Sequence, residues 1–269
     1  MRSILLLGLL ALAGCGGPRI DTSHPSTGHS SRVQYIVLHY TSADLPRSLE
    51  LLGGDEVSAH YLVGAQPPTV YRLVDENRRA WHAGDSKWQG RTWLNASTLG
   101  IELVNPGYEE DAEGNRHWHP YPPRQIEALI GLLKELVRRH ALPPDSIIGH
   151  SDIAPQRKVD PGPLFPWRRL AREGLIRWPE EAQLGPRQRL FAAVGLPPTA
   201  WFQERLAQVG YRVPRHGEPD EETRRVLAAF QMKYRPARHD GVADAETAAL
   251  LQVLAPAPAL VVAPGNPAD

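Results

Sequence analysis

The clearest pattern of apolar and polar positions lies in residues 123–140, PRQIEALIGLLKELVRRH. Apolar side chains recur there at i, i+3, i+4, i+7 and i+11, which places them along one stripe of an α-helix. Prolines stand at the start of the segment, and three basic residues crowd its end, where cations suit the helix dipole. We therefore predict a helix over 123–140 that buries the stripe formed by Ile126, Leu129, Ile130, Leu133 and Val137.

Shorter runs rich in β-branched and aromatic residues predict strands on both sides of this helix. The segments SAHYLVG and TVYRLVD are separated by Ala-Gln-Pro-Pro and are expected to form a hairpin. The other strand candidates are 33–39 (VQYIVLH), 97–105 (STLGIELVN) and 145–150 (DSIIGH), and short helices are expected over 45–53 and 164–174. This mixture of strands and helices predicts an α/β or α+β domain over residues 32–177.

The remainder of the chain is predominantly helical in its pattern. Residues 178–198 are expected to be a connector with some helical content, and 199–254 contain an approximate repeat, RHGEPDEET and RHDGVADAET. Asp220 and Asp244 each precede a threonine by three residues, where a carboxylate can accept from the free N–H groups at a helix start. We expect a small all-α domain over 199–254, followed by an Ala/Pro-rich tail over 255–269.

The first residues, MRSILLLGLLALAGCGG, predict export and lipid attachment. One Arg precedes an apolar stretch that is too short to span a bilayer and that suits a secretory signal. The stretch ends in Leu-Ala-Gly-Cys, which resembles the lipobox of bacterial lipoproteins. We expect a lipoprotein signal peptide over 1–15, acylation at Cys15 with chains such as palmitate, and a polar tether over 16–31. The alternative is an ordinary signal with an incidental cysteine.

Charge and histidine placement narrow the possible functions. Lys+Arg and Asp+Glu number 30 each, so the formal net charge is zero and a strongly basic nucleic-acid binder is disfavoured. His39 and His150 end two predicted strands, and Asp160 lies ten residues after His150. If the two strands are neighbours, two imidazoles and one carboxylate converge, a set that fits a catalytic zinc with an open fourth position.

Five segments, in this order, carry a family resemblance: IVLHYT, SAHYLV, AWHAG, LNASTLGIELVN and GHSDIAPQRKVDPGP. Together they resemble the zinc-dependent N-acetylmuramoyl-L-alanine amidases of type 2, which share their fold with the peptidoglycan recognition proteins. The resemblance covers about residues 33–175 and implies a central mixed β-sheet flanked by helices. It also implies hydrolysis of the amide bond between N-acetylmuramic acid and the L-Ala of the peptidoglycan stem peptide, in cell-wall turnover.

The resemblance assigns roles to particular residues. It implies His39, His150 and Asp160 as ligands of one Zn²⁺ per chain, Glu102 as general base and Lys158 as the cation that stabilises the developing oxyanion. Strand alternation supports Glu102, because its apolar neighbours point to the opposite face. The alternatives are a surface glutamate on an edge strand and a solvated loop lysine.

Four further residues are candidate substrate contacts, namely His60, Trp81, His82 and Asn95. The alternatives are buried, hydrogen-bonded histidines, a core tryptophan and an asparagine that fixes a loop. Ala59 stands where the phage-lysozyme-like members of the family have a tyrosine, so the role of base is assigned to Glu102.

The second domain resembles small helical peptidoglycan-binding domains through WFQERLAQVGY and DEETRRVLAAFQ. A plain helical cap on the first domain is the alternative. The expected partners are peptidoglycan or muropeptides and, through Cys15, a membrane, with no nucleic acid. The expected location is the bacterial cell envelope, as a monomeric outer-membrane lipoprotein facing the periplasm, because no Asp follows the cysteine.

Three rival functions remain at this stage. A non-catalytic peptidoglycan-binding lipoprotein would share the fold, but such proteins lose metal ligands that are present here. A non-haem iron oxygenase would use His150 and Asp152, with His216 as a distal ligand. A purely structural lipoprotein would leave the metal-ligand set and Glu102 without a purpose.

Overall fold

The computed structural model describes residues 17–255, so the predicted signal peptide and Cys15 lie outside the described residues. The chain divides into two units, one ending at Ser30 and one beginning at Ser31. Residues 17–30 are exposed and contain no helix or strand, and the sheets, helices and candidate site all belong to the second unit. No helix within the described range combines the length and the apolar character needed to cross a membrane.

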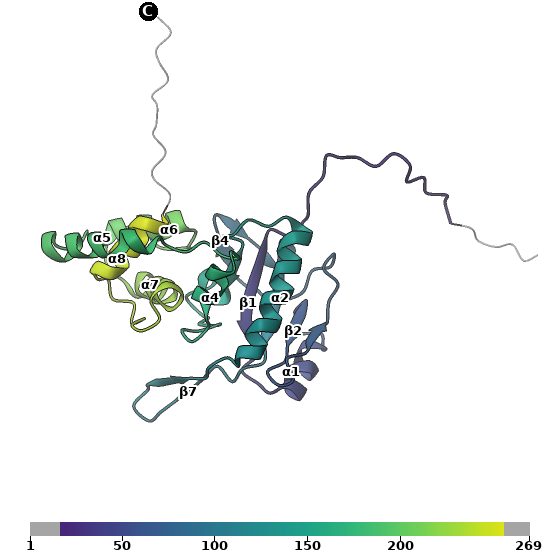
Figure 1. Ribbon diagram of the computed structural model, residues 1–269, viewed down its shortest axis with the longest axis horizontal. Helices are drawn as coiled ribbons and strands as arrows, with labels where there is room; N and C mark the ends of the chain where they lie inside the picture. Colours follow the sequence, from purple (N-terminus) through teal and green to yellow (C-terminus); the bar gives the residue numbers. More distant parts are fainter. Residues whose placement is uncertain (1–16, 256–269) are drawn as a thin grey trace, which may run out of the picture. The chain divides into compact units, whose positions relative to one another are not determined.

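A five-stranded mixed sheet forms the centre of the first domain (Figure 1). Its strand order is β3–β2–β6–β1–β9, with β3 at Val70–Arg72, β2 at Tyr61–Val63, β6 at Thr98–Leu103, β1 at Tyr35–Tyr40 and β9 at Ile147–Gly149. Strand β1 pairs in parallel with both β6 and β9, and β2 pairs in parallel with β6. Within this sheet only β2 and β3 are antiparallel, and they form the predicted hairpin. The prediction of a mixed sheet is confirmed.

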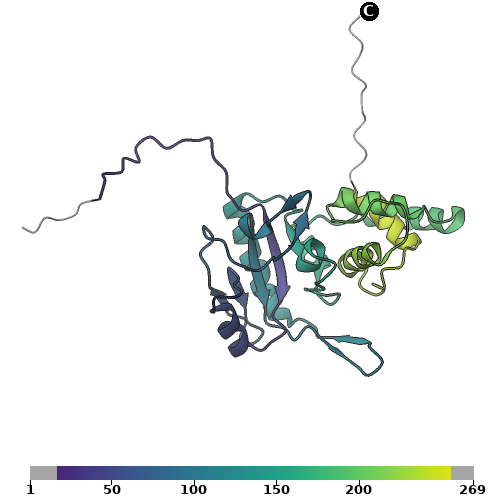
Figure 2. The ribbon, with the colours of Figure 1, turned by 180° about the vertical axis from the view of Figure 1, so that it is seen from behind.

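Helix α2, Pro123–His140, has the predicted bounds and lies along one face of the sheet (Figures 1 and 2). Its buried stripe packs against alternate residues of β1 and β6, including Ile36, Leu38, Leu99 and Ile101. The last buried residue of the stripe is Leu136, which is fully buried. Val137, which was predicted to be part of the stripe, is only partly buried. Burial of these apolar side chains is the main stabilising contribution of the helix, since propensity alone is a weak term.

The remaining elements of this domain are short. They are helix α1 at Leu45–Leu52, the 3₁₀ turn η1 at Leu94–Ala96, helix α3 at His150–Ile153, helix α4 at Trp167–Arg172, and two small ladders, β4 (Lys87–Trp88) with β5 (Arg91–Thr92) and β7 (Tyr108–Glu110) with β8 (Arg116–Trp118). Asp44 caps α1 by accepting from the amide of Arg47. At its other end this helix stops at Leu52, one residue before the predicted end at Gly53.

Four helices follow: α5 at Glu181–Val194, α6 at Thr199–Val209, α7 at Glu221–Tyr234 and α8 at Ala245–Leu254. The segment expected to be a connector is mostly helix α5, which packs against α8. Its apolar and polar positions show little one-sided pattern, and Phe191 is the only residue of this helix that is buried, so the sequence offered a weak signal for it. The helical part of the second domain therefore begins before residue 199.

The sequence repeat in the second domain is also a structural repeat. Asp220 accepts from the amide of Thr223 at 2.6 Å, and Asp244 accepts from the amide of Thr247 at 2.8 Å. Before each cap, the side chain of one buried glutamine bridges the loop. Its nitrogen donates to the hydroxyl of the threonine at the helix start, Thr223 or Thr247, and its oxygen accepts from the amide of a glycine in the loop. These glutamines are Gln203 and Gln231, and they satisfy backbone groups that the two sharp loops would otherwise leave unpaired.

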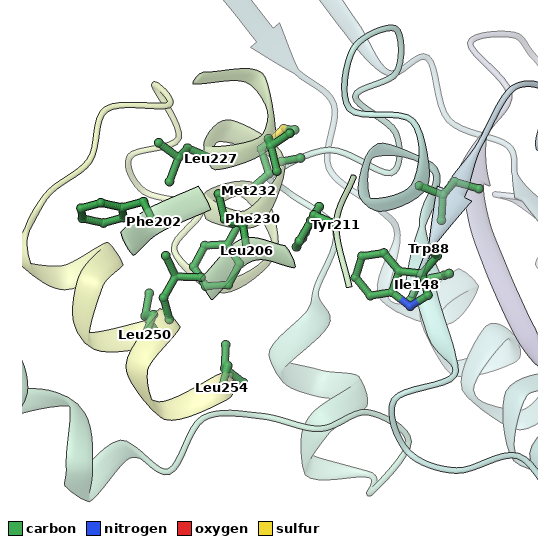
Figure 3. Packing of buried hydrophobic residues seen from close by; sticks show 14 of the residues in the cluster. Trp88, Ile148, Phe202, Leu206, Tyr211, Leu227, Phe230, Met232, Leu250 and Leu254 are labelled. Atoms are coloured by element: carbon green, nitrogen blue, oxygen red, sulfur yellow. The ribbon is translucent and has the colours of Figure 1, made fainter. Parts of the chain in front are cut away.

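A buried ion pair joins the two domains. Asp152, in α3, accepts from the Tyr211 hydroxyl at 2.6 Å and from the Lys233 ammonium at 2.8 Å. The same carboxylate accepts from the amide of Gly149 at 2.8 Å, directly before the candidate ligand His150. Apolar packing continues across the junction, where the rings of Trp88 and Tyr211 are 5.0 Å apart (Figure 3). The helical domain is therefore fixed to the turn that carries His150.

Candidate metal centre and catalytic cleft

The parallel pairing of β1 with β9 brings together two histidines that are distant in the sequence. Leu38 pairs with Gly149, and the next residue on each strand is a candidate ligand, His39 on one and His150 on the other. Asp160 reaches them from a loop that is tied back to α3, because its carbonyl accepts from the amide of Ser151 at 2.8 Å. All three side chains are buried.

The three ligand atoms form a nearly equilateral triangle. His39 Nδ1 lies 2.9 Å from His150 Nδ1 and 3.1 Å from Asp160 Oδ2, and His150 Nδ1 lies 3.1 Å from the same oxygen. Ligands bound to one tetrahedral zinc at about 2.0–2.1 Å are about 3.3 Å apart, so these spacings are close to those that the metal requires. Two imidazole nitrogens and one carboxylate oxygen are also the donor types of catalytic zinc sites. The residues present therefore fit a zinc ion.

The electrostatics of the triangle favour the protonation states that metal binding needs. Burial and the neighbouring His150 lower the pKa of His39 to about 4, so this imidazole is neutral at pH 7. Burial alone raises the pKa of Asp160, but the charge of His150 and hydrogen bonds from both histidines hold it well below its usual range. Neutral imidazole and ionised carboxylate are the metal-binding forms.

Glu102 lies beside this triangle on β6. It pairs with His39 across the two parallel strands, so the two side chains point to the same face of the sheet. Since β6 is the middle strand of five, the alternative of a surface glutamate on an edge strand is wrong. Burial, and then the charge of Asp160, raise the pKa of the Glu102 carboxyl to about 8, while Lys158 opposes this. Its Oε2 atom is buried without a hydrogen-bond partner among the described residues.

An open cleft of about 750 Å³ exposes these groups to a ligand. Its lining includes His39, Glu102, Lys158, Trp81 and Tyr108. Lys158 is exposed, and none of the ion pairs between described residues involves it. The volume is within the range that drug-sized ligands occupy, and the lining combines apolar walls with a few convergent polar groups.

The four predicted substrate contacts lie in different surroundings. Trp81 lines the cleft and is 48% exposed, and His82 lies at its base. His60 is fully buried outside the cleft lining, where it accepts from the amide of Gly100 at 3.0 Å. Asn95 is also outside the lining and accepts from the amides of His82 and Ala83. The structure favours the alternatives for His60 and Asn95, a buried hydrogen-bonded histidine and an asparagine that fixes a loop, because His60 Nδ1 and Asn95 Oδ1 accept from backbone amides.

The oxygenase alternative is excluded by the surroundings of its proposed ligands. Asp152 is occupied by Lys233 and Tyr211 and is not part of the triangle. His216 lies in the second domain, where it pairs with Asp220 at 2.8 Å.

Sequence reasoning missed two residues beside the centre. Thr98, the first residue of β6, has its hydroxyl 3.1 Å from His82 Nε2. Arg157 donates to the carbonyl groups of Ala83 and Asp85 and so fastens the loop next to His150. Arg157 stands beside Lys158 in the segment GHSDIAPQRKVDPGP. Nothing in the neighbouring sequence indicates that this arginine donates to backbone carbonyl groups.

The fold and the site together define an α/β protein with a set of side chains that could hold a metal ion near the carboxyl ends of two parallel strands. Comparison with known families makes the class specific. Residues 29–163 match the N-acetylmuramoyl-L-alanine amidase family, and 196–251 match a family of peptidoglycan binding domains. The chain belongs to the N-acetylmuramoyl-L-alanine amidase family and is an amidase of this kind.

The similarity to individual relatives extends over both domains. The N-acetylmuramoyl-L-alanine amidase AmiD of Escherichia coli is 41% identical over 93% of this chain and 95% of its own length. Its structure superposes with a TM-score of 0.77 over 88% of this chain and 94% of that one. AmpDh3 of Pseudomonas aeruginosa gives 0.81 at 37% identity, over 88% of this chain and 98% of that one. The 1,6-anhydro-N-acetylmuramyl-L-alanine amidase AmpD of Enterobacter cloacae is 44% identical, but over only 38% of this chain and 49% of its own.

Proposed function

We propose that the protein is a zinc-dependent amidase that cleaves the bond between the lactyl group of N-acetylmuramic acid and the L-Ala of the stem peptide. The observation that carries this proposal is the triangle of His39, His150 and Asp160 at the base of an open cleft, with Glu102 beside it. The substrates of similar proteins support the bond assignment. The AmiD structure contains anhydro-N-acetylmuramic acid-L-Ala-D-γ-Glu-L-Lys, and one AmpDh3 structure contains an anhydromuramic pentapeptide.

The chemistry follows from the charges in the cleft. His39, His150 and Asp160 would hold the zinc ion, which supplies Lewis acidity and lowers the pKa of a bound water toward neutrality. The Glu102 carboxylate accepts a proton from the water that attacks the amide carbon and later gives it to the leaving nitrogen of L-Ala. The Lys158 ammonium stabilises the negative charge that develops on the amide oxygen. The C–N bond breaks, leaving a muramoyl carboxylate and a free stem peptide.

The second domain supports this reaction by holding the same polymer. We propose that residues 199–254 bind peptidoglycan, consistent with the family match over 196–251. Attachment to the wall raises the effective concentration of cleavable bonds at the cleft. The domain also packs on the amidase domain through Asp152, so the role as a cap and the role as a binding module are compatible.

The function is tested by identifying the products. Zinc-loaded protein incubated with muropeptides is expected to release free stem peptide and peptide-free muramoyl sugars, as read by mass spectrometry. A chelator stops the release, and added Zn²⁺ restores it. Muropeptides that remain intact although they bind the zinc-loaded protein would favour the non-catalytic alternative instead.

We further propose that the enzyme is a monomeric lipoprotein of the outer membrane that faces the periplasm. The lipobox-like sequence ending at Cys15 and the polar residues that follow it support this proposal. Acyl chains on Cys15 would hold it firmly, since each buried methylene contributes about 0.8 kcal/mol. With Cys15→Ala, the protein is expected to lose palmitate labelling and to leave the membrane fraction. Unchanged membrane fractionation of this variant would refute the anchor.

A further inference from the structure

We propose that His82, Thr98 and Asn95 are positioning residues that fix the ring orientation and the tautomer of both histidine ligands. The inference depends on the proposed metal-dependent function and goes beyond it. It assigns to His82 and Asn95 a role other than substrate contact. It also adds Thr98, for which neither sequence pattern nor family resemblance indicated a role.

A directed chain of hydrogen bonds begins at His39. Its Nδ1 faces the other two ligands, while its Nε2 lies 3.0 Å from His82 Nδ1. A histidine that binds a metal through Nδ1 carries its proton on Nε2 and needs an acceptor for it. His82 Nδ1 can accept this proton only if the His82 ring carries its own proton on Nε2.

Thr98 determines this second proton position. Its hydroxyl donates to the carbonyl of Leu94 at 2.7 Å, so the single hydroxyl hydrogen is already used. The Thr98 oxygen can therefore only accept from His82 Nε2, which lies 3.1 Å away. Because a backbone carbonyl cannot donate, the whole chain runs in one direction and leaves the lone pair of His39 Nδ1 facing the metal position.

The second ligand is oriented by the residue next to His82. The Nε2 atom of His150 lies 3.3 Å from the carbonyl oxygen of Ala83 and 3.4 Å from Arg157 Nη2, and of these two only the carbonyl can accept a proton from it. This places the lone pair of His150 Nδ1 toward His39 and Asp160. Arg157 donates to the same carbonyl and holds it in place. The dipeptide His82–Ala83 thus supplies the acceptors for both ligands.

Asn95 holds this dipeptide. Its side-chain Oδ1 accepts from the amide of His82 at 3.1 Å and from the amide of Ala83 at 2.8 Å. Asn95 belongs to η1, the same turn whose Leu94 carbonyl ends the hydrogen-bond chain. One short turn therefore fixes both the His82 ring and the Ala83 carbonyl.

The strand beside His82 is shaped to admit its ring. A Cβ atom at Gly100 would lie 2.4 Å from His82 Cγ, closer than side chains approach one another. Both ring nitrogens of His82 are engaged within the protein, although the residue borders the cleft. A substrate contact would leave a ring nitrogen free to face the cleft, so this arrangement favours a positioning role.

The test compares Thr98→Val, which keeps the shape but removes the acceptor, with Thr98→Ser, which keeps the hydroxyl. Zinc affinity of the full chain, measured by competition with a chelating dye, is expected to fall about 10–100-fold in Thr98→Val and to recover in Thr98→Ser. The matched control is Thr92→Val, the same substitution at an exposed position of β5, and it should leave the affinity unchanged.

A second readout reports the tautomer itself. In ¹⁵N NMR spectra of the zinc-loaded protein, His82 is expected to be protonated on Nε2, and Thr98→Val should weaken this preference. Should Thr98→Val fail to fold, the pair Asn95→Leu and Asn95→Asp replaces it, since only the aspartate keeps an acceptor for both amides. Wild-type zinc affinity and an unchanged His82 tautomer in folded Thr98→Val or Asn95→Leu would overturn the proposal. That outcome would leave the proposed amidase function unaffected. Zinc binding without cleavage of muropeptides would contradict the amidase function and leave the positioning role unaffected.

Discussion

Replacing Glu102 with Gln is expected to lower kcat by at least about 100-fold and, at the same time, to make the metal-free protein more stable at high pH. The loss of activity follows because positioned general acid–base groups contribute about 10²–10⁴ in rate. Glutamine has nearly the same shape, so the cleft and the three ligands stay in place. Turnover of muropeptides by the zinc-loaded variant, at a pH near 8, measures the first effect.

The stability effect follows from the sign of the Glu102 pKa shift. Burial raises this pKa from 4.5 to about 8 in the folded protein. The folded state therefore binds more protons than the unfolded state between these values, and stability falls as pH rises through this range. A glutamine at this position does not ionise, so the variant does not lose stability in this way. Its free energy of unfolding should exceed that of the wild type by a few kcal/mol at pH 9. At pH 4 the difference should be small.

Urea unfolding at pH 4, 7 and 9 in the presence of a chelator measures this dependence. Glu113→Gln, in the exposed loop between β7 and β8, is a matched control that should change neither activity nor the pH dependence. Two results would contradict the role of Glu102. One is a variant that retains more than a tenth of wild-type kcat, and the other is a stability difference that does not grow with pH.

Replacing Asp160 with Ala is expected to abolish metal binding while the chain stays folded. Two histidines remain, and a site that lacks one of three ligands should lose more affinity than the 10–100-fold typical of changes around the ligands. Folding should persist because the removed group is a buried charge held by polar contacts, not part of the apolar packing around α2. Turnover should fall to background because no metal is held beside Glu102.

Zinc content after dialysis, measured by plasma mass spectrometry, gives the direct readout, and circular dichroism verifies the fold. Asp145→Ala, an exposed aspartate before β9, is the control and should keep one zinc per chain. If Asp160→Ala binds zinc as tightly as the wild type, the metal is held elsewhere and the proposed centre is wrong.

The sequence by itself determined those features that depend on near neighbours in the chain. The bounds of α2 follow from a 3.6-residue period, and the caps at Asp220 and Asp244 follow from side chains that bond amides three residues away. The identity of the candidate ligands also came from the sequence, because five motifs in a fixed order are specific even when each alone is weak.

Only the tertiary structure decided which of these residues meet. His39 and His150 are 111 residues apart and approach because β1 and β9 are neighbours, and Glu102 joins them because β6 is central and not an edge. The local sequence does not show which partners the imidazoles of His60 and His82 have, yet one accepts from a backbone amide and the other lies against His39. The physical reason is that the role of an imidazole depends on which donors and acceptors surround its two nitrogens, and these partners come from elements that are distant in the chain.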